Sequence, residues 1–129
     1  MSTPRPYTRP FPSSWWLQRA SYRRYMLREM TCVLIGAWTL TMVVGVIRLA
    51  QGDAAWNGFL AALATPAGVI FQILALIAAI YHSVTWFSLA PRTMPLRVAG
   101  RRVPAAWITM GHYIAWALIT LIVLIIAGG

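Results

Sequence analysis

Residues 66–89 read PAGVIFQILALIAAIYHSVTWFSL, and this stretch decides the fold because it contains no Asp, Glu, Lys or Arg. A helix needs about 20 apolar residues to cross the roughly 30 Å hydrocarbon core of a membrane. Inside that core, backbone amides and carbonyls find their hydrogen-bond partners within the helix itself. The stretch therefore predicts a transmembrane helix. Pro66 suits its first turn, where the missing N–H needs no partner, and Ala90-Pro91 is expected to end it.

Two further tracts have the same character. The first carries no charge from Met30 to Ile47 and predicts a span over about residues 27–49. The second predicts a span over about residues 104–127. The sequence therefore predicts an all-α integral membrane protein, with three transmembrane helices in residues 26–127.

The segments outside the spans have their own compositions. Residues 54–64, between the first two spans, are expected to lie at the membrane interface with Trp56 and Phe59 at headgroup level. Residues 1–25 are rich in proline, arginine and aromatic side chains and predict an extended arm. Together with the start of the first span they form a basic lead that is too long for a cleaved signal peptide. The prolines of the arm are Pro4, Pro6, Pro10 and Pro12.

The composition excludes an ordinary soluble domain. Of the 129 residues, 60% are hydrophobic and 10% are charged, which is too apolar for a soluble domain of this size. All 11 basic residues are arginines and the acids are Glu29 and Asp53, so the formal net charge is +9. Such a charge often indicates nucleic-acid binding. Here the arginines stand between long uncharged tracts, so we interpret them as markers of loop sidedness and expect no nucleic-acid partner.

The positions of the arginines predict the orientation of the helices. Cytoplasmic loops of membrane proteins carry an excess of basic residues. The N-terminal segment and the loop between the second and third spans are rich in arginine, whereas the loop between the first and second spans has only Arg48, near Asp53. We therefore expect the N-terminus in the cytoplasm and the C-terminus outside. The arginines of the two basic segments are Arg5, Arg9, Arg19, Arg23, Arg24 and Arg28, and Arg92, Arg97, Arg101 and Arg102.

Arg28 and Glu29 stand at the inner boundary of the first span. Ionisable side chains near hydrocarbon are costly to keep there and often mark function. One interpretation is structural, an interfacial carboxylate paired with a neighbouring arginine. The other is functional, with Glu29 handling protons or binding a ligand. Cys32, the single cysteine, is interpreted as an inert thiol because it has no second cysteine with which to build a disulfide or a metal site.

His82 and Trp86 lie in the inner half of the second span. His82 is about seven residues before the end of that span, hence roughly 10 Å below the inner boundary. Trp86 is four residues further on, so the two side chains share a helix face. Together they could hold a flat, partly polar ligand by one hydrogen bond and one aromatic wall. The structural alternative is that Trp86 anchors the helix at the interface and His82 bonds a neighbouring helix.

His112, in the third span, has a depth that matches His82. Two histidines on different helices at one depth could ligate a b-type haem. This is the weaker hypothesis, because either histidine could instead bond a neighbouring helix. With Arg28 and Glu29 these residues all fall near the inner leaflet. A quinone headgroup needs such a place, with an apolar path for its tail, hydrogen-bonding groups and a proton route to water.

Two of these regions carry a family resemblance. Trp15-Trp16, followed by YRRYMLRE at residues 22–29, resembles the N-terminal signature of the fumarate reductase C-subunit family. HSVTWFSLAP at residues 82–91 resembles the second signature of that family, at the end of its second helix. PYTRP at residues 6–10 and the total length also fit, whereas the third span matches in hydropathy alone.

The resemblance implies a membrane anchor of quinol:fumarate reductase in the bacterial cytoplasmic (inner) membrane. Such an anchor pairs with a second membrane anchor subunit, and the two hold an iron–sulfur subunit and a flavoprotein subunit at the cytoplasmic face. The partners carry the iron–sulfur clusters and FAD, and fumarate is reduced on the flavin. Quinol, typically menaquinol, is oxidised between the anchors and the iron–sulfur subunit.

The resemblance also implies roles for individual residues. By motif, Arg28, Glu29, His82 and Trp86 line the quinol site, and Glu29 assists proton release. Anchors of this kind hold no haem, and His112 lies outside both signatures. Two alternatives stay open: an anchor of a succinate dehydrogenase working in the oxidative direction, with a b-type haem on His82 and His112, and a purely structural anchor. The residues set neither the direction of the reaction nor the identity of the quinone.

Overall fold

A computed structural model describes residues 12–128 of the chain. Three of its helices are long and apolar enough to cross a membrane. This confirms the predicted all-α membrane fold, and the second span begins at Pro66 as expected. The elements are η1 (Trp15–Leu17), α1 (Ala20–Ala50), α2 (Asp53–Leu63), α3 (Pro66–Thr93), β1 (Arg97–Val98), β2 (Arg101–Arg102) and α4 (Ala105–Gly128).

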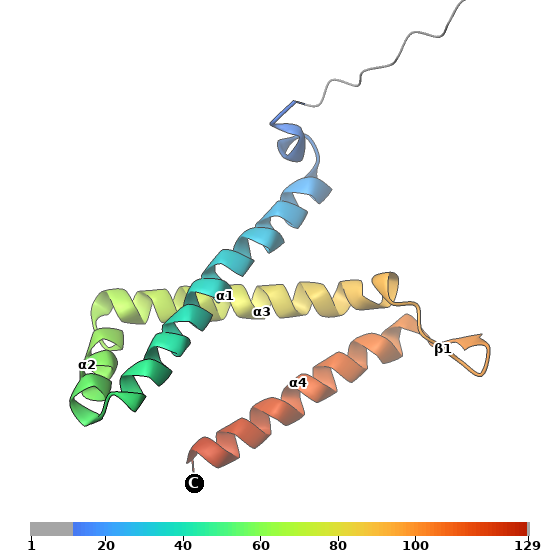
Figure 1. The fold of residues 1–129 in the computed structure, drawn as a ribbon. Coiled ribbons are helices and arrows are strands. Elements are labelled where there is room, and N and C mark those ends of the chain that lie inside the picture. Colours follow the sequence, from blue (N-terminus) through green and yellow to red (C-terminus); the bar gives the residue numbers. More distant parts are fainter. Residues whose placement is uncertain (1–11, 129) are drawn as a thin grey trace, which may run out of the picture.

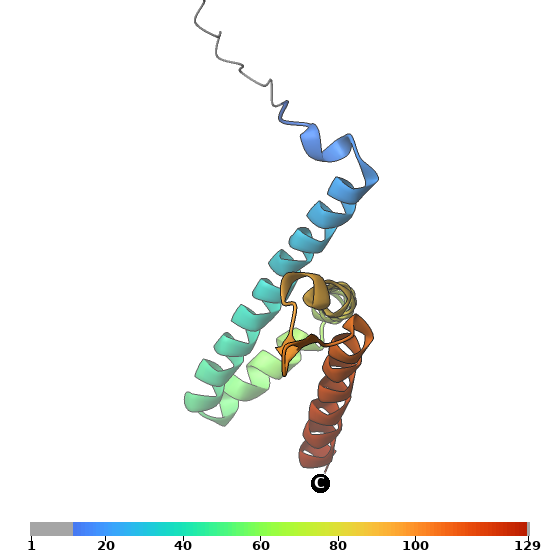
Figure 2. The same cartoon turned by 90° about the vertical axis from the view of Figure 1, so that its right-hand side faces the viewer.

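Helix α3 is the centre of the molecule. Figure 2 shows it nearly end-on between α1 and α4, and in Figure 1 it is crossed by α1. It contacts α1, α2 and α4, whereas no contact joins α1 to α4 in the described part of the chain. The buried residues at these packings are small, and small residues let membrane helices approach closely. They are Thr31 and Gly45 on α1 and Ala75, Ala78 and Ala90 on α3.

The outer surfaces of the three long helices remain apolar and exposed. No residue of α4 within the described range is buried, and side chains such as Ile122 and Ile126 are more than half exposed. An exposed apolar surface of this extent is what a bilayer or a partner helix covers. The packed interior of the described chain therefore consists of the surfaces of α3 that face α1 and α4 and of the smaller contact between α1 and α2.

The short helix α2 folds back between the end of α1 and the start of α3 (Figure 1). Its Phe59 ring packs over Gly45 of α1, where a Cβ atom would lie 2.8 Å from the ring. Phe59 also stacks on Trp56, with ring centroids 5.6 Å apart. The expected level of these two rings in a membrane stays a prediction, but Phe59 has a packing role that the sequence pattern did not indicate.

The turn into α3 is closed by a helix cap and a close backbone approach. The Thr65 hydroxyl accepts a hydrogen bond from the amide of Gly68 at 3.2 Å and donates to the carbonyl of Ala62 at 2.7 Å. Threonine is a favourable residue at this position because it satisfies an amide of the first turn. A Cβ at Gly68 would lie 2.5 Å from the Leu63 carbonyl oxygen. Glycine is therefore required where the two helices meet.

The prediction that Ala90-Pro91 ends the second helix is wrong. Helix α3 continues to Thr93 with Pro91 inside it. Proline removes the hydrogen bond to the carbonyl four residues earlier, which here is the carbonyl of Phe87. The hydroxyl of Thr109 on α4 donates to that oxygen at 3.3 Å. A neighbouring helix thus supplies the missing donor, which is how membrane helices tolerate an internal proline.

The N-terminal part is more helical than expected. Helix α1 begins at Ala20, so residues 20–25 of the predicted arm belong to it. The preceding turn packs against this helix, because Arg23 Nη1 donates to the Leu17 carbonyl at 3.0 Å. The Trp15 and Tyr22 rings also meet edge to face at 5.2 Å. The extended arm predicted from Pro4, Pro6 and Pro10 lies outside the described residues.

A small hairpin joins α3 to α4. Strands β1 and β2 are antiparallel, with Arg97 opposite Arg102. Ala99 and Gly100 both have positive φ, 50° and 77°, as a tight type I′ hairpin turn requires. The hairpin was not predicted, and it places exposed arginines at the loop that the arginine pattern assigned to the cytoplasmic side.

Candidate functional site

The candidate site lies where the first part of α1 packs against the second half of α3. Arg28 and Glu29 are neighbours on α1, and their side chains form an ion pair. Arg28 Nη2 lies 3.0 Å and Nε 3.3 Å from the same oxygen, Glu29 Oε1. The Arg28 side chain is 13% exposed and that of Glu29 is 42% exposed. Within the described residues, the second oxygen of Glu29 has no hydrogen-bond partner and is available to a ligand.

The Arg28 guanidinium also joins the two helices through an aromatic ring. Its carbon lies 5.1 Å from the centre of the Trp86 ring on α3 and 5.2 Å from that of Tyr25 on α1. A guanidinium over an aromatic ring is attracted to the electron-rich face of the ring. Arg28 is therefore held by one carboxylate and two rings. The indole of Trp86 remains 41% exposed.

His82 is tied to α1 on the other side of this group. Its Nδ1 lies 3.0 Å from the hydroxyl of Thr31 and 3.8 Å from the thiol of Cys32. Its ring centroid is 6.2 Å from that of Trp86, at an interplanar angle of 51°. Nε2 of His82 has no hydrogen-bond partner among residues 12–128, so the imidazole has one nitrogen engaged and one free.

The structure thus brings Arg28, Glu29, His82 and Trp86 together, and we refer to these four residues as the Arg28 cluster. It combines a fixed cation, a carboxylate oxygen, an imidazole nitrogen and a partly exposed indole face. These groups can bind a flat ring that carries oxygen atoms, because the indole contacts the ring face while the polar groups contact the oxygens. The exposure of Trp86 and Glu29 leaves the site open on one side. The described residues therefore form one face of this group and leave the other face uncovered.

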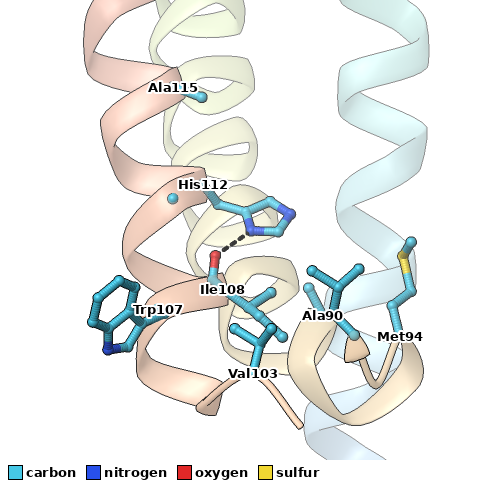
Figure 3. A pocket seen from close by; sticks show the side chains of 9 residues that line it. Ala90, Met94, Val103, Trp107, Ile108, His112 and Ala115 are labelled. Carbon is cyan, nitrogen blue, oxygen red and sulfur yellow. Dashed lines mark hydrogen bonds between the residues drawn. The ribbon is translucent and has the colours of Figure 1, made fainter. Parts of the chain in front are cut away.

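His112 lies apart from this cluster. Its Nδ1 is 2.7 Å from the carbonyl of Ile108, one turn earlier on α4, and its ring is 5.3 Å from that of Phe87. His112 lines a pocket of about 530 Å³ between the end of α3, the residues that flank the hairpin, and α4. Figure 3 shows its ring among the side chains that line this pocket. His112 is the one ionisable side chain in the lining, which is otherwise apolar. The lining residues are Ala90, Met94, Leu96, Val103, Trp107, Ile108, Gly111, His112 and Ala115.

The two histidines contact different sides of α3. His82 bonds α1, whereas His112 packs against Phe87, which faces α4. Phe87 is five positions after His82 on α3, so the two side chains point about 140° apart around the helix. A haem held by both histidines would have to lie between them, where α3 itself stands. The structure therefore brings the residues of the Arg28 cluster together and leaves His112 apart from them, and their predicted level near the inner leaflet stays a prediction.

Two contacts of the site were missed from the sequence. Tyr25 stands three residues before Arg28, and this spacing places both on one face of a helix, so the contact could have been anticipated. Thr31 has no such signal. Its contact with His82 depends on how α1 packs along α3, which the hydropathy of two apolar helices does not specify.

The sequence of this chain is similar to known proteins along nearly its whole length. The sequence model of a family described as the C subunit of fumarate reductase matches residues 2–128. A fumarate reductase C subunit from Mycobacterium tuberculosis (strain CDC 1551 / Oshkosh) is 39% identical over 117 residues, covering 91% of this chain and 93% of the relative. One from Vibrio parahaemolyticus serotype O3:K6 (strain RIMD 2210633) is 40% identical over 126 residues, covering 98% of this chain and 99% of the relative. These matches include the third span, for which the sequence offered only hydropathy.

Proposed function

The chain belongs to the fumarate reductase C-subunit family, and from this membership we propose that it is the membrane anchor of a quinol:fumarate oxidoreductase. As a member of the family it is a membrane subunit of a multi-subunit enzyme. In the proposal it pairs with a second anchor subunit in a bacterial inner membrane. The pair attaches an iron–sulfur subunit and a flavoprotein subunit to the cytoplasmic face, and fumarate is reduced on the flavoprotein.

The Arg28 cluster is the observation that supports a quinol site in this chain. A quinol has a flat ring with a hydroxyl on each side, and the cluster offers a partly exposed indole beside a carboxylate and an imidazole. Oxidation of quinol releases two protons, so the site needs a proton acceptor with access to water. Glu29 meets this need, because its carboxylate is 42% exposed and one of its oxygens is free of the Arg28 bond.

The exposed arginines support docking of the soluble subunits at the same end of the molecule. Arg19, directly before α1, and Arg23 and Arg24 on α1 precede the cluster, and the hairpin adds further exposed arginines. The described residues contain two carboxylates, Glu29 and Asp53, and only Glu29 forms an ion pair. No described carboxylate neutralises Arg19, Arg23 or Arg24, so an acidic partner surface can pair with them and steer association. A soluble iron–sulfur subunit docked there would cover the open side of the cluster.

Replacement of Glu29 in the assembled enzyme tests the proposal. Glu29→Gln keeps the shape of the side chain and removes its ability to accept a proton. We expect fumarate reduction with menaquinol as donor to fall by roughly 100-fold or more, the range of a lost acid–base group. Reduction driven by a soluble artificial donor, which bypasses the quinol site, should remain. Asp53→Asn at the start of α2 is the matched control and should leave both activities unchanged. Equal loss of both activities in Glu29→Gln would indicate failed assembly, whereas unaltered activity with menaquinol would contradict the proposed role.

A further inference from the structure

The imidazole of His82 is oriented by a hydroxyl from another helix. Thr31 is among the few buried residues of the described chain, with 9% of its surface exposed. Its Oγ1 contacts two groups, the backbone carbonyl of Arg28 and Nδ1 of His82. The direction of these two hydrogen bonds is set by the number of hydrogens available.

A threonine hydroxyl has one hydrogen, and a carbonyl oxygen can only accept. In its bond with the Arg28 carbonyl, Thr31 must therefore be the donor. The contact between Thr31 and His82, at 3.0 Å, can then form only if His82 donates its Nδ1 hydrogen to the hydroxyl oxygen. A neutral imidazole has a single N–H, so Nε2 carries the lone pair.

We propose that Thr31 is a positioning residue that holds His82 in the Nδ1–H tautomer, so that Nε2 accepts a hydrogen bond from a quinol hydroxyl and the site favours quinol over quinone. The inference rests on the proposed quinol site and deepens it. Nε2 is free within residues 12–128, and the ring that bears it stands 6.2 Å from the Trp86 ring, where the flat headgroup would lie.

The preference follows from the hydrogen-bonding groups of the two forms of the ligand. A quinol hydroxyl can donate to Nε2, whereas a quinone carbonyl can only accept and would meet a second acceptor there. A buried acceptor without a donor is costly. Arg28 does not discriminate in this way, because its N–H groups can donate to the oxygen of either form. The distinction between the reduced and the oxidised ligand therefore depends on which nitrogen of His82 carries the hydrogen.

Cys32 is the second group that contacts Nδ1, at 3.8 Å. A thiol is a weak acceptor compared with a hydroxyl. Thr31 should therefore dominate the choice of tautomer, and removal of the Cys32 thiol should have little effect. Thr31 and Cys32 contact the same nitrogen, so substitution of Thr31 is the test and substitution of Cys32 is the control.

The test uses the assembled, membrane-extracted enzyme with a soluble naphthoquinol as donor to fumarate. The KM for the naphthoquinol and the inhibition constant of the matching oxidised naphthoquinone are measured for each variant. Thr31→Val replaces the hydroxyl by a methyl group of similar size, so the Nε2–H tautomer becomes accessible and can donate to the quinone. We expect the ratio of KM to the inhibition constant to rise about three- to tenfold, the effect of one hydrogen bond. Thr31→Ser and Cys32→Ala should keep the ratio of the unaltered enzyme.

The outcomes separate this inference from the proposed function. A ratio that stays constant in Thr31→Val, or that changes as much in Thr31→Ser, would overturn the role of the hydroxyl. If Glu29→Gln lowers quinol oxidation in the same preparation, the quinol site itself would stand. If neither Glu29→Gln nor Thr31→Val changes any quinol parameter, the site lies on other subunits and both proposals fail. Activity with the artificial donor reports whether each variant is assembled.

Discussion

The hydroxyl of Thr109 lies 3.3 Å from the carbonyl oxygen of Phe87, the one carbonyl of α3 that Pro91 deprives of its intrahelical donor. The contact joins α4 to α3 at the position where α3 would otherwise have an unpaired polar group inside the membrane. It explains how α3 continues past Pro91, and it is also an attachment point for a helix that has no buried residue within the described chain.

This relationship predicts a coupled response to substitution. Thr109→Val should destabilise the enzyme by about 0.5–1.5 kcal/mol, because the Phe87 carbonyl loses its donor. Pro91→Ala restores a backbone N–H four residues after Phe87 and should make Thr109 dispensable. The loss caused by Thr109→Val should therefore be smaller in the Pro91→Ala background. Thermal unfolding of the unaltered enzyme, the two single variants and the double variant measures this difference. Strictly additive effects would show that the two positions are independent.

A second prediction concerns the packing of α2 on α1. Gly45→Ala should destabilise the chain by about 1–3 kcal/mol, because the added Cβ would overlap the Phe59 ring at 2.8 Å. The matched control is Gly36→Ala on the same helix, where no atom lies within 4 Å of the added Cβ. That change should be neutral or slightly stabilising. Phe59→Leu should partly rescue Gly45→Ala in thermal unfolding. Equal effects of the two glycine substitutions would contradict the packing described.

A third prediction separates the charge of Arg28 from its shape. Arg28→Lys keeps the positive charge and loses both the two-nitrogen contact with Glu29 and the planar contact with Trp86. We expect the KM for quinol to rise by about three- to tenfold, since a partly buried cation–π contact contributes about 1 kcal/mol. Activity with a soluble artificial donor should not change. A lysine variant with unaltered quinol kinetics would show that charge alone suffices.

A fourth prediction concerns sidedness, which the arginine pattern indicates and the fold does not determine. A phosphatase reporter that is active only outside the cytoplasm should be active when fused after Gly129 and inactive when inserted at Ala99-Gly100, the tip of the hairpin. The insertion point has a positive φ at both residues and lies away from the helices, so the fusion should not disturb packing. The reverse pattern would invert the orientation and place the Arg28 cluster on the outer side.

The sequence was sufficient for the three spans and for naming the four residues that the structure brings together. Hydrophobic length predicted the three helices, and Thr65-Pro66 predicted where the second begins, because both signals are local. The four residues of the Arg28 cluster were identified from their polarity at membrane depth and from the family resemblance. Their neighbourhood in space then follows from the packing of α1 on α3.

The features that were missed depend on contacts between helices. The end of α3 was placed too early because Pro91 is a stop signal unless another helix supplies a donor, and Thr109 is 18 residues away in sequence. Thr31 was not identified because its neighbour on α3 depends on the register of two apolar surfaces. His112 was grouped with His82 by predicted depth alone. In the structure His82 contacts α1, whereas His112 packs against the side of α3 that faces α4.

The absence of contact between α1 and α4 in the described chain has a consequence for biogenesis. As the chain leaves the ribosome, α1 enters the bilayer with Arg28, Glu29 and Thr31 unsupported by any later segment. Arg28 gains Trp86 and Thr31 gains His82 when α3 is inserted, and α4 adds nothing to them directly. A nascent chain arrested after the hairpin would therefore already contain the complete Arg28 cluster.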